Sequence, residues 1–194
     1  KGLQETRHIS RIQVHPRDPD VAYVAAVGNL WKESPERGVY KTTDGGDTWE
    51  LVLFLDNHTG AIDLVMDPSD PNTLFAAMYS RRRTAWGFNG GGPGSGIYRT
   101  MDGGASWTRL QEGLPKGELG RIGLDIYRRD GNLVFATVEA RRGQTGLYGS
   151  TDGGDTWEKL SGTNPRPMYF SQIRVDPNDP KRVYVGGTNL MRSD

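Results

Sequence analysis

The sequence predicts an all-β protein, a β-propeller of four-stranded antiparallel blades, and three observations lead to this fold class. Two short motifs alternate along the chain at nearly constant spacing, which is the pattern of a repeat protein. The 194 residues include 27 glycines and 11 prolines, which is above the usual share and indicates many tight turns. No long amphipathic stretch is present, so we expect short strands that follow one another closely.

The first motif is an eight-residue turn that ends in tryptophan. It reads TTDGGDTW at residues 42–49, TMDGGASW at 100–107 and STDGGDTW at 150–157, and we call these three segments the DGG turns. Their aspartates, Asp44, Asp102 and Asp152, lie 58 and 50 residues apart. A period of that length suits one propeller blade of four strands.

The second motif is a turn rich in proline and aspartate. It reads HPRDPDVAY from residue 15, DPSDPNTLF from residue 67 and DPNDPKRVY from residue 176, with a degenerate copy, DIYRRDGNLVF, from residue 125. Proline and aspartate favour turns through a fixed φ and through side-chain to backbone hydrogen bonds. Because the two motifs keep the same order and period, each repeat reads as strand, Pro/Asp turn, strand, loop, strand, DGG turn, strand.

The strands follow from alternating apolar and polar residues between these turns. We expect strands at 9–14, 21–27, 39–42 and 48–54, then at 61–66, 74–79, 97–100 and 106–110, then at 119–126, 133–139, 147–150 and 156–160. The blades therefore span about 8–55, 60–111 and 119–161, with an incomplete fourth at 170–194. Residues 1–194 form one propeller domain or part of a larger ring, and the fourth repeat stops inside a fourth DGG turn.

The DGG turn has a local mechanism that predicts a structural role. Asp44 can accept hydrogen bonds from the backbone of its own turn, and Gly45 and Gly46 can adopt the positive φ of a tight hairpin. The alternative is a calcium site formed by Asp44 and Asp47. The second copy has Ala105 in place of the second carboxylate, so we expect Asp44, Asp102 and Asp152 to be structural.

The three DGG turns resemble Asp boxes, the S/T-x-D-x-G-x-T/S-W signature also called the bacterial neuraminidase (BNR) repeat. This signature occurs in sialidases, sortilin-type receptors, xyloglucan-cleaving propeller glycosidases and photosystem assembly propellers. With the adjacent DP-x-DP-x-x-x-Y element, the chain is most similar to bacterial exported proteins with sortilin-like propellers, often described as glycosyl hydrolases. The resemblance implies an extracellular or periplasmic parent protein, and structural boxes on the face away from the ligand.

Composition excludes several function classes. Lys+Arg and Asp+Glu are both 24, so the neutral net charge argues against nucleic-acid binding. No apolar run is long enough for a membrane span, so we expect a soluble protein. The chain has no cysteine, which excludes disulfides, thiolate zinc sites and a cysteine nucleophile.

Candidate ligand-binding residues lie on the loops opposite the DGG turns, a surface that we call the loop face. The long segment 80–89 carries three arginines that can clamp a carboxylate or phosphate and two aromatic residues that can stack on a sugar ring or a base. Arg11 and Arg121 take matching positions in the first strands, as in an arginine triad, but Asp63 and Gln172 fill the other two positions. The remaining ligand-binding candidates are Arg81, Arg82, Arg83, Trp86, Phe88, Asn89 and Trp31.

Candidate catalytic and metal-binding residues also lie on the loop face. His8 and His58 precede first strands of adjacent blades, and two imidazoles with carboxylates can hold zinc or another divalent metal that activates water. A glycosidase instead needs two carboxylates about 5–10 Å apart. The candidates for these are Asp63, Glu118, Glu33 and Glu139. The alternative for all these residues is a solvated polar rim.

The sequence therefore favours a binding or scaffold module that recognises a peptide or a glycan on its loop face. A metal-dependent hydrolase and a glycoside hydrolase-like domain remain as alternatives. For assembly, we expect a homodimer formed through the open blade edges. The alternative is a closed four-bladed ring in which residues 1–4 lie beside residues 190–193.

Overall fold

The structure is a computed structural model that describes residues 2–141 and 143–193. Lys1, Arg142 and Asp194 lie outside the described residues. Lys1 belongs to the expected 1–4 segment, and Asp194 to the incomplete fourth DGG turn.

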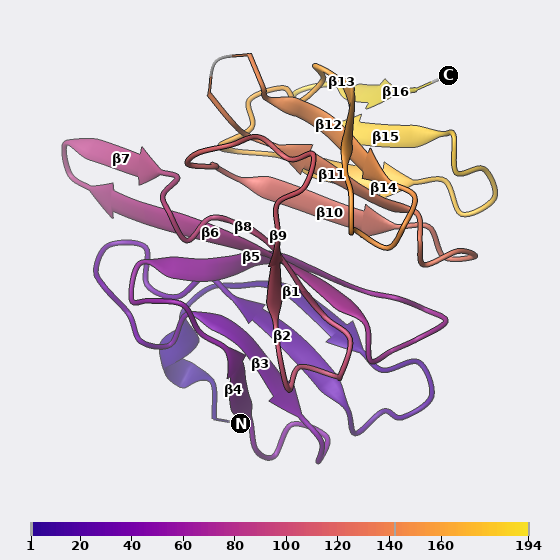
Figure 1. Ribbon diagram of the computed structural model, residues 1–194. Coiled ribbons are helices and arrows are strands. Elements are labelled where there is room, and N and C mark those ends of the chain that lie inside the picture. Colours follow the sequence, from indigo (N-terminus) through magenta and orange to yellow (C-terminus); the bar gives the residue numbers. More distant parts are fainter. Residues whose placement is uncertain (1, 142, 194) are drawn as a thin grey trace.

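Four antiparallel sheets follow one another along the chain as four blades of a propeller (Figure 1). A short 3-10 helix, η1 (Gln4–Thr6), precedes them. Blade 1 contains β1 (Ile9–Val14), β2 (Ala22–Ala26), β3 (Gly38–Thr42) and β4 (Glu50–Leu53). Blade 2 contains β5 (Thr59–Met66), β6 (Leu74–Thr84), β8 (Gly96–Thr100) and β9 (Thr108–Leu110), with β7 (Gly87–Gly90) paired to β6. Blade 3 contains β10 (Ile122–Ile126), β11 (Val134–Val138), β12 (Gly146–Ser150) and β13 (Glu158–Ser161), and blade 4 contains β14 (Gln172–Val175), β15 (Val183–Gly186) and β16 (Leu190–Arg192).

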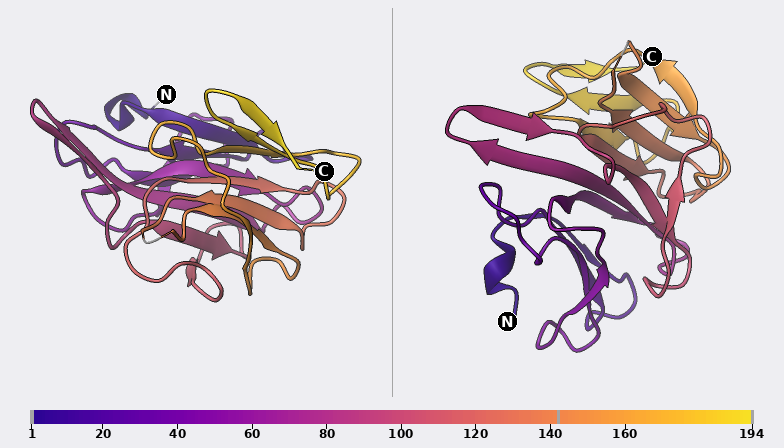
Figure 2. Two further views of the ribbon diagram at one scale, coloured as in Figure 1. Left: turned by 90° about the horizontal axis from the view of Figure 1, so that it is seen from above. Right: turned by 60° about the vertical axis from the view of Figure 1, so that its left-hand side comes forward.

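The sheets pack face to face, and the core lies between them (Figures 1 and 2). Small and branched residues on the middle strands let neighbouring sheets approach closely. The largest clusters of buried side chains join blade 1 to blade 2 and blade 2 to blade 3. Fully buried members of these clusters include Val39, Leu64, Leu74, Met78, Ile97, Ile122 and Leu124.

The first strands of successive blades are tied together by carboxylate to backbone hydrogen bonds. Asp63 on β5 accepts a bond from the backbone N–H of Leu124 on β10, at 3.0 Å. Asp125 on β10 accepts a bond from the N–H of Val175 on β14, at 2.8 Å. An aspartate of one blade thus replaces the β-ladder that neighbouring inner strands lack, and it fixes the spacing of the blades.

The three DGG turns share one hydrogen-bond pattern, as the sequence predicts. In the first turn, Asp44 Oδ1 accepts bonds from the Thr48 N–H at 2.9 Å and from the Thr42 hydroxyl at 2.7 Å. The Thr48 hydroxyl donates to Asp44 Oδ2 at 2.5 Å. Gly45 and Gly46 have φ of 69° and 92°, so the turn requires glycine at both positions. The second and third turns repeat these bonds within 0.1 Å.

Each of the later DGG turns also contacts the blade before it. In the second turn, the Gly103 carbonyl accepts bonds from Tyr23 Oη and Lys41 Nζ of blade 1, both at 2.9 Å. In the third turn, the Gly153 carbonyl accepts a bond from Arg99 Nη1 of blade 2, at 2.6 Å. The DGG turn is therefore an element of blade-to-blade packing as well as a hairpin.

Apolar side chains are exposed at both ends of the row of blades. On β1, Ile12 and Val14 are exposed, and at the other end β16 pairs only with β15 among the described strands. The sequence analysis offered a closed four-bladed ring, with residues 1–4 beside residues 190–193, as an alternative. For residues 2–4, the described part of that segment, this alternative is wrong. Leu3 packs beside Trp49 on blade 1 and not along β16. The homodimer stays a prediction.

In the described part of the chain we find no helical segment with the length and apolar character of a membrane span.

We expect acid to weaken the DGG turns. Hydrogen bonds from the Ser106 hydroxyl and N–H lower the pKa of Asp102 from 3.8 to about 2. A carboxylate with a lowered folded-state pKa stabilises the fold above its ordinary pKa, and that stabilisation is lost as the pH falls from about 4 to about 2. Asp102→Asn should lower the melting temperature at pH 7 by roughly 2–4 °C and flatten the decline between pH 4 and pH 2.

Differential scanning calorimetry from pH 7 to pH 2 measures both effects. Glu158→Gln, at an exposed position on β13, is the matched control and should melt as the wild type does. An Asp102→Asn protein with the wild-type acid profile would contradict the assigned role of the turn aspartates.

Candidate functional site

The loop face carries a two-stranded hairpin where the sequence predicted a loop. β6 continues beyond its sheet and pairs with β7, and this hairpin projects from the blades (Figures 1 and 2). The expectation of a loop at residues 80–89 is therefore wrong. The ladder continues because Arg81 pairs with Gly90 and Arg83 pairs with Phe88, which places alternate side chains on the same face.

Within the hairpin, the ring of Phe88 contacts the side chains of two arginines. The guanidinium groups of Arg81 and Arg83 lie 5.4 and 5.6 Å from the ring centre of Phe88, within the range of a cation–π contact. Phe88 is thus already in contact with cations. Arg82, on the other face of the strand, is exposed.

Two exposed tryptophans lie on adjacent parts of the loop face. Trp86, at the hairpin tip, is 91% exposed, and Trp31, on the loop after β2, is 58% exposed. The Arg83 N–H donates to the Leu30 carbonyl at 2.7 Å, which holds the Trp31 loop against the hairpin. The structure therefore joins the two segments that carry these tryptophans, which the sequence assigned to different blades.

A cluster of polar side chains lies at the base of the hairpin. Tyr79 is fully buried, and its hydroxyl has no hydrogen-bond partner within residues 2–141 and 143–193. The same holds for Nε of Arg81. A side chain at Gly90 would bring its Cβ within 2.6 Å of the Tyr79 hydroxyl, so glycine is needed there for the hairpin to cover the tyrosine.

Charge and burial perturb this cluster strongly. Burial, together with the nearby carboxylate of Glu139, raises the pKa of Tyr79 to about 12. Burial also raises the pKa of Glu139, although the Arg121 N–H donates to its carboxylate at 2.9 Å. Burial and the positive charge of Arg81 lower the pKa of Arg121. Two guanidinium groups and one partly desolvated carboxyl group thus share one site, which is typical of functional sites.

A small cleft opens beside this cluster, between the hairpin and blade 3. Its volume is about 190 Å³, and it is lined by Asn89, Glu118, Glu139 and Arg141 among others. Glu118 is exposed, and its Oε2 lies 3.5 Å from Nη2 of Arg141. The cleft therefore holds two carboxyl groups in different environments, one exposed and one partly buried.

Asp63 lies away from this cleft and is used by the fold. It is 4% exposed, and its carboxylate accepts bonds from Arg11 Nε at 2.8 Å and from the Leu64 and Leu124 N–H groups at 2.9 and 3.0 Å. With both carboxylate oxygens engaged, Asp63 has the environment of a structural residue.

Arg11 and Arg121 do not occupy matching positions, so this part of the sequence analysis is wrong. Arg11 pairs with Ala25, and the residue of blade 3 in that register is Gly123. The sequence placed the degenerate Pro/Asp copy two residues too early, because the N–H of Tyr127, and not that of Asp125, bonds across its turn as the His15 N–H does in blade 1. Arg121 instead corresponds to His8, since the carbonyl of each accepts the N–H that follows the second strand.

Each of the two predicted metal ligands, His8 and His58, has a ring nitrogen close to an oxygen atom of the protein. His8 Nδ1 lies 3.1 Å from the Gly28 carbonyl oxygen, and His58 Nε2 lies 3.7 Å from Glu33 Oε1. No group of three His, Asp or Glu side chains that could hold a metal occurs among the described residues. Zinc binding by His8 and His58 stays a prediction without further support.

Comparison with known proteins shows similarity to enzymes named xyloglucanases. The chain is 26% identical over 204 residues to a probable oligoxyloglucan-reducing end-specific xyloglucanase of Neosartorya fischeri, covering 100% of this chain and 22% of that protein. It is 30% identical over 179 residues to a xyloglucanase of Hypocrea jecorina, covering 85% of this chain and 18% of that protein. The chain is a β-propeller related to xyloglucanase propellers. No family model matches it.

Solved structures agree on the fold. The GH74 enzyme of Niastella koreensis superposes with a TM-score of 0.70 at 18% identity, over 95% of this chain and 29% of that one. YCF48 bound to D1 peptide superposes with a TM-score of 0.53 at 14% identity, over 98% of this chain and 56% of that one. The chain spans about a fifth of the length of the two xyloglucanases, so its blades match part of a larger propeller.

Sequence reasoning missed Tyr79 as a site residue. Tyr79 and Glu139 stand at the same repeat position as the buried, apolar Val27, one residue beyond the last pair between the second and third strands. A comparison of repeats position by position would have identified them, because a polar residue that replaces a core valine needs a partner.

We expect Asp63 to matter for stability. Asp63→Ala removes the partner of Arg11 and leaves two buried N–H groups without an acceptor, so the free energy of unfolding should fall by about 2–4 kcal/mol. Urea denaturation followed by tryptophan fluorescence measures the change. The exposed carboxyl of Glu118 provides the control, and Glu118→Gln should leave stability unchanged. A loss below about 1 kcal/mol for Asp63→Ala would contradict this role.

Proposed function

We propose that this propeller is a glycan-binding module whose loop face holds the ligand between Trp31 and Trp86. The observation that carries the proposal is the exposure of these two indole rings on segments that a backbone hydrogen bond holds together. An exposed indole offers a flat apolar surface together with an N–H donor, which suits a ligand that has both an apolar face and polar groups. A sugar ring has an apolar face that suits an indole and hydroxyl groups around its edge that suit guanidinium and carboxyl groups.

The polar cluster supports a ligand with several hydroxyl groups. Arg82 is exposed on the same hairpin as Trp86, and the cleft next to the hairpin offers Asn89 and Glu118 as a donor and an acceptor. These groups can bind hydroxyls without a requirement for net charge on the ligand. The names of the related propellers support the same class, because they act on xyloglucan or its oligosaccharides.

A peptide is the competing ligand, since the similar fold of YCF48 has been solved with a D1 peptide. We favour the glycan because the two exposed indole rings provide flat surfaces on which sugar rings can stack. A peptide would instead add to the outer edge of β7, which pairs only with β6 among the described strands.

Isothermal titration calorimetry with oligoxyloglucan and with unrelated peptides tests the proposal. We expect saturable binding of the glycan, and Trp86→Ala should weaken it roughly tenfold, or about 1.4 kcal/mol. Met101→Ala removes an exposed apolar side chain on the opposite face and should bind as the wild type does. Peptide binding without glycan binding, or an unaffected Trp86→Ala protein, would contradict the proposal.

A hydrolase is a second candidate, favoured by the two glutamates of the 190 Å³ cleft. Burial raises the pKa of Glu139, which suits a general acid, and the exposed Glu118 can act as the base or nucleophile. We expect any glycosidase activity to decline as the pH rises through the raised pKa of Glu139. Reducing-sugar release from oligoxyloglucan between pH 4 and pH 8, with Glu139→Gln and Glu118→Gln, measures this. Activity that survives both substitutions would exclude this pair.

We also infer that the three DGG turns are Asp boxes of the kind found in exported, sortilin-like propellers. Their shared hydrogen-bond pattern supports a common structural role, and it involves the face opposite the proposed ligand.

A further inference from the structure

The polar cluster at the base of the β6–β7 hairpin contains hydrogen-bond donors that have no acceptor. The Tyr79 hydroxyl is fully buried and has no partner among residues 2–141 and 143–193, and the same holds for Nε of Arg81. Tyr79 and Arg81 are two residues apart on β6, so their side chains lie on the same face of the strand. A buried donor without an acceptor is rare in folded proteins, and a bound water or ion often explains it.

The guanidinium groups of Arg81 and Arg121 also lack a carboxylate partner. Both side chains are partly buried, and neither forms an ion pair with another residue in the described part of the chain. The Phe88 ring, 5.4 Å from the Arg81 guanidinium, holds that group in place. A partly buried positive charge without a counterion is costly, so this cluster favours the binding of an anion.

The carboxylates near the cluster are already bonded to other groups. Glu139 Oε2 accepts a hydrogen bond from a backbone N–H at 2.9 Å. Asp63 accepts a bond from Arg11 Nε at 2.8 Å, and Glu118 Oε2 lies 3.5 Å from Nη2 of Arg141. A further acceptor for the unpartnered donors would therefore come from a ligand.

The cleft of about 190 Å³ between the hairpin and blade 3 is bordered by direct neighbours of these donors. Its lining includes Gly90 and Gly120. Gly90 pairs with Arg81 across the hairpin and covers the Tyr79 hydroxyl, since a Cβ built on it would lie 2.6 Å from that oxygen. Gly120 precedes Arg121 in the sequence. A ligand in the cleft therefore lies next to all three donors, and it reaches the tyrosine hydroxyl when Gly90 moves aside.

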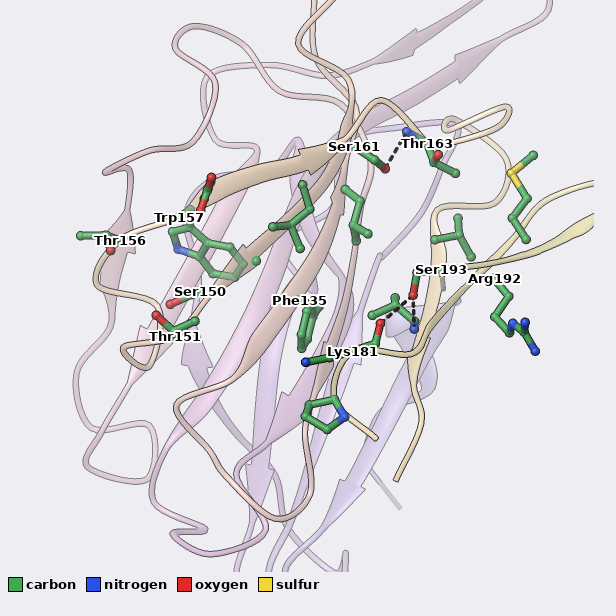
Figure 3. A pocket seen from close by; sticks show the side chains of 18 residues that line it. Phe135, Ser150, Thr151, Thr156, Trp157, Ser161, Thr163, Lys181, Arg192 and Ser193 are labelled. Carbon is green, nitrogen blue, oxygen red and sulfur yellow. Dashed lines mark hydrogen bonds between the residues drawn. The ribbon is translucent and has the colours of Figure 1, made fainter. Parts of the chain in front are cut away.

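A larger cavity, of about 680 Å³, lies beside β13 and β16 and differs from this cleft in its polar groups (Figure 3). Phe135 lies in its middle, and the hydroxyl groups at its rim have partners. The Thr163 N–H donates to Ser161 Oγ at 3.2 Å, and Ser193 Oγ donates to the Lys181 carbonyl at 2.8 Å. The unpartnered donors therefore favour the hairpin cleft as the site of a charged ligand.

We propose that Tyr79, Arg81 and Arg121 form a binding site for the carboxylate group of an acidic sugar, such as a uronic acid. A guanidinium group can donate two parallel hydrogen bonds to a carboxylate, and the tyrosine hydroxyl can donate another. Two positive charges share the site with one carboxylate of the protein, that of Glu139. A ligand group with a single negative charge therefore suits the site better than a doubly charged phosphate.

The choice of a sugar rests on the proposed function. Trp86 lies at the tip of the hairpin whose base carries Arg81, so one sugar chain can extend from the exposed indole to the cleft. The carboxylate site would then add a preference for acidic glycans to a face that also offers groups for neutral hydroxyls.

Isothermal titration calorimetry with oligogalacturonate and with its methyl ester tests the proposal, because the two ligands differ in the charge of the carboxyl groups. We expect the acid to bind about tenfold more tightly than the ester, and the difference to shrink as the salt concentration rises. Arg121→Gln should remove this preference. Arg17→Gln removes the same charge from an exposed position on the first Pro/Asp turn and should leave the preference unchanged.

Two further variants separate carboxylate binding from a purely structural role. Tyr79→Phe removes only the unpartnered hydroxyl, so the protein should be at least as stable as the wild type while it binds the acid more weakly. Glu139→Gln removes a negative charge and keeps an oxygen that can accept the Arg121 N–H, so it should bind the acid more tightly. Circular dichroism checks that Arg121→Gln is folded, and Arg81→Gln replaces it if it is not.

The proposal is overturned if the acid and the ester bind equally well, or if Tyr79→Phe and Arg121→Gln both keep the full preference for the acid. It is also overturned if a glutamate-rich peptide binds as tightly as oligogalacturonate, because the ligand would then not be a sugar. The proposed function can fail separately. Oligogalacturonate binding that depends on Arg121 and not on Trp86 would contradict the role of the indole rings and support the carboxylate site, whereas oligoxyloglucan binding without any preference for the acid would overturn the carboxylate site alone.

Discussion

The contact between each of the two later DGG turns and the blade before it is the constraint on which the rest of the structure depends. Within its own blade the turn is fixed by aspartate hydrogen bonds, and its glycines let the backbone lie directly on an aromatic residue of the preceding blade. A basic side chain of that blade then bonds to the turn carbonyl, as Lys41 and Arg99 do. One eight-residue segment thus closes a hairpin and sets the distance between two sheets.

Because of this constraint, the face that carries the DGG turns has the same geometry in each repeat. The loops on the opposite face differ from one repeat to the next. The DGG and Pro/Asp turns meet on the same side, where the Gly103 N–H donates to the Asn72 carbonyl of the neighbouring turn. At the opposite ends of the strands the contacts between blades differ from one repeat to the next, as with the bond from the Arg83 N–H to the Leu30 carbonyl. The hairpin of β6 and β7, the Trp31 loop and the pair Tyr79 and Glu139 all occur there, which is why the proposed ligand site lies on that side.

The sequence predicted the strands and turns well because their determinants are local. The hydrogen bonds of Asp44 join residues at most four positions apart, and alternating apolar residues locate β1 and β5. It did not predict features that depend on register between strands. Register makes Tyr127, and not Asp125, the equivalent of His15, which moves Arg121 away from the position of Arg11. The hairpin depends on pairing across residues 80–89.

Amide hydrogen exchange at the three turns tests the central claim most directly. The N–H groups of Gly46, Gly104 and Gly154 make the same bond to a turn hydroxyl, at 2.9, 2.9 and 2.8 Å. Gly104 and Gly154 are buried against a preceding blade, whereas Gly46 is only partly buried. If packing on the preceding blade stabilises the turns, Gly104 and Gly154 should exchange at least tenfold more slowly than Gly46. Equal exchange at all three glycines would show that the bonds within the turn suffice, and would contradict the account.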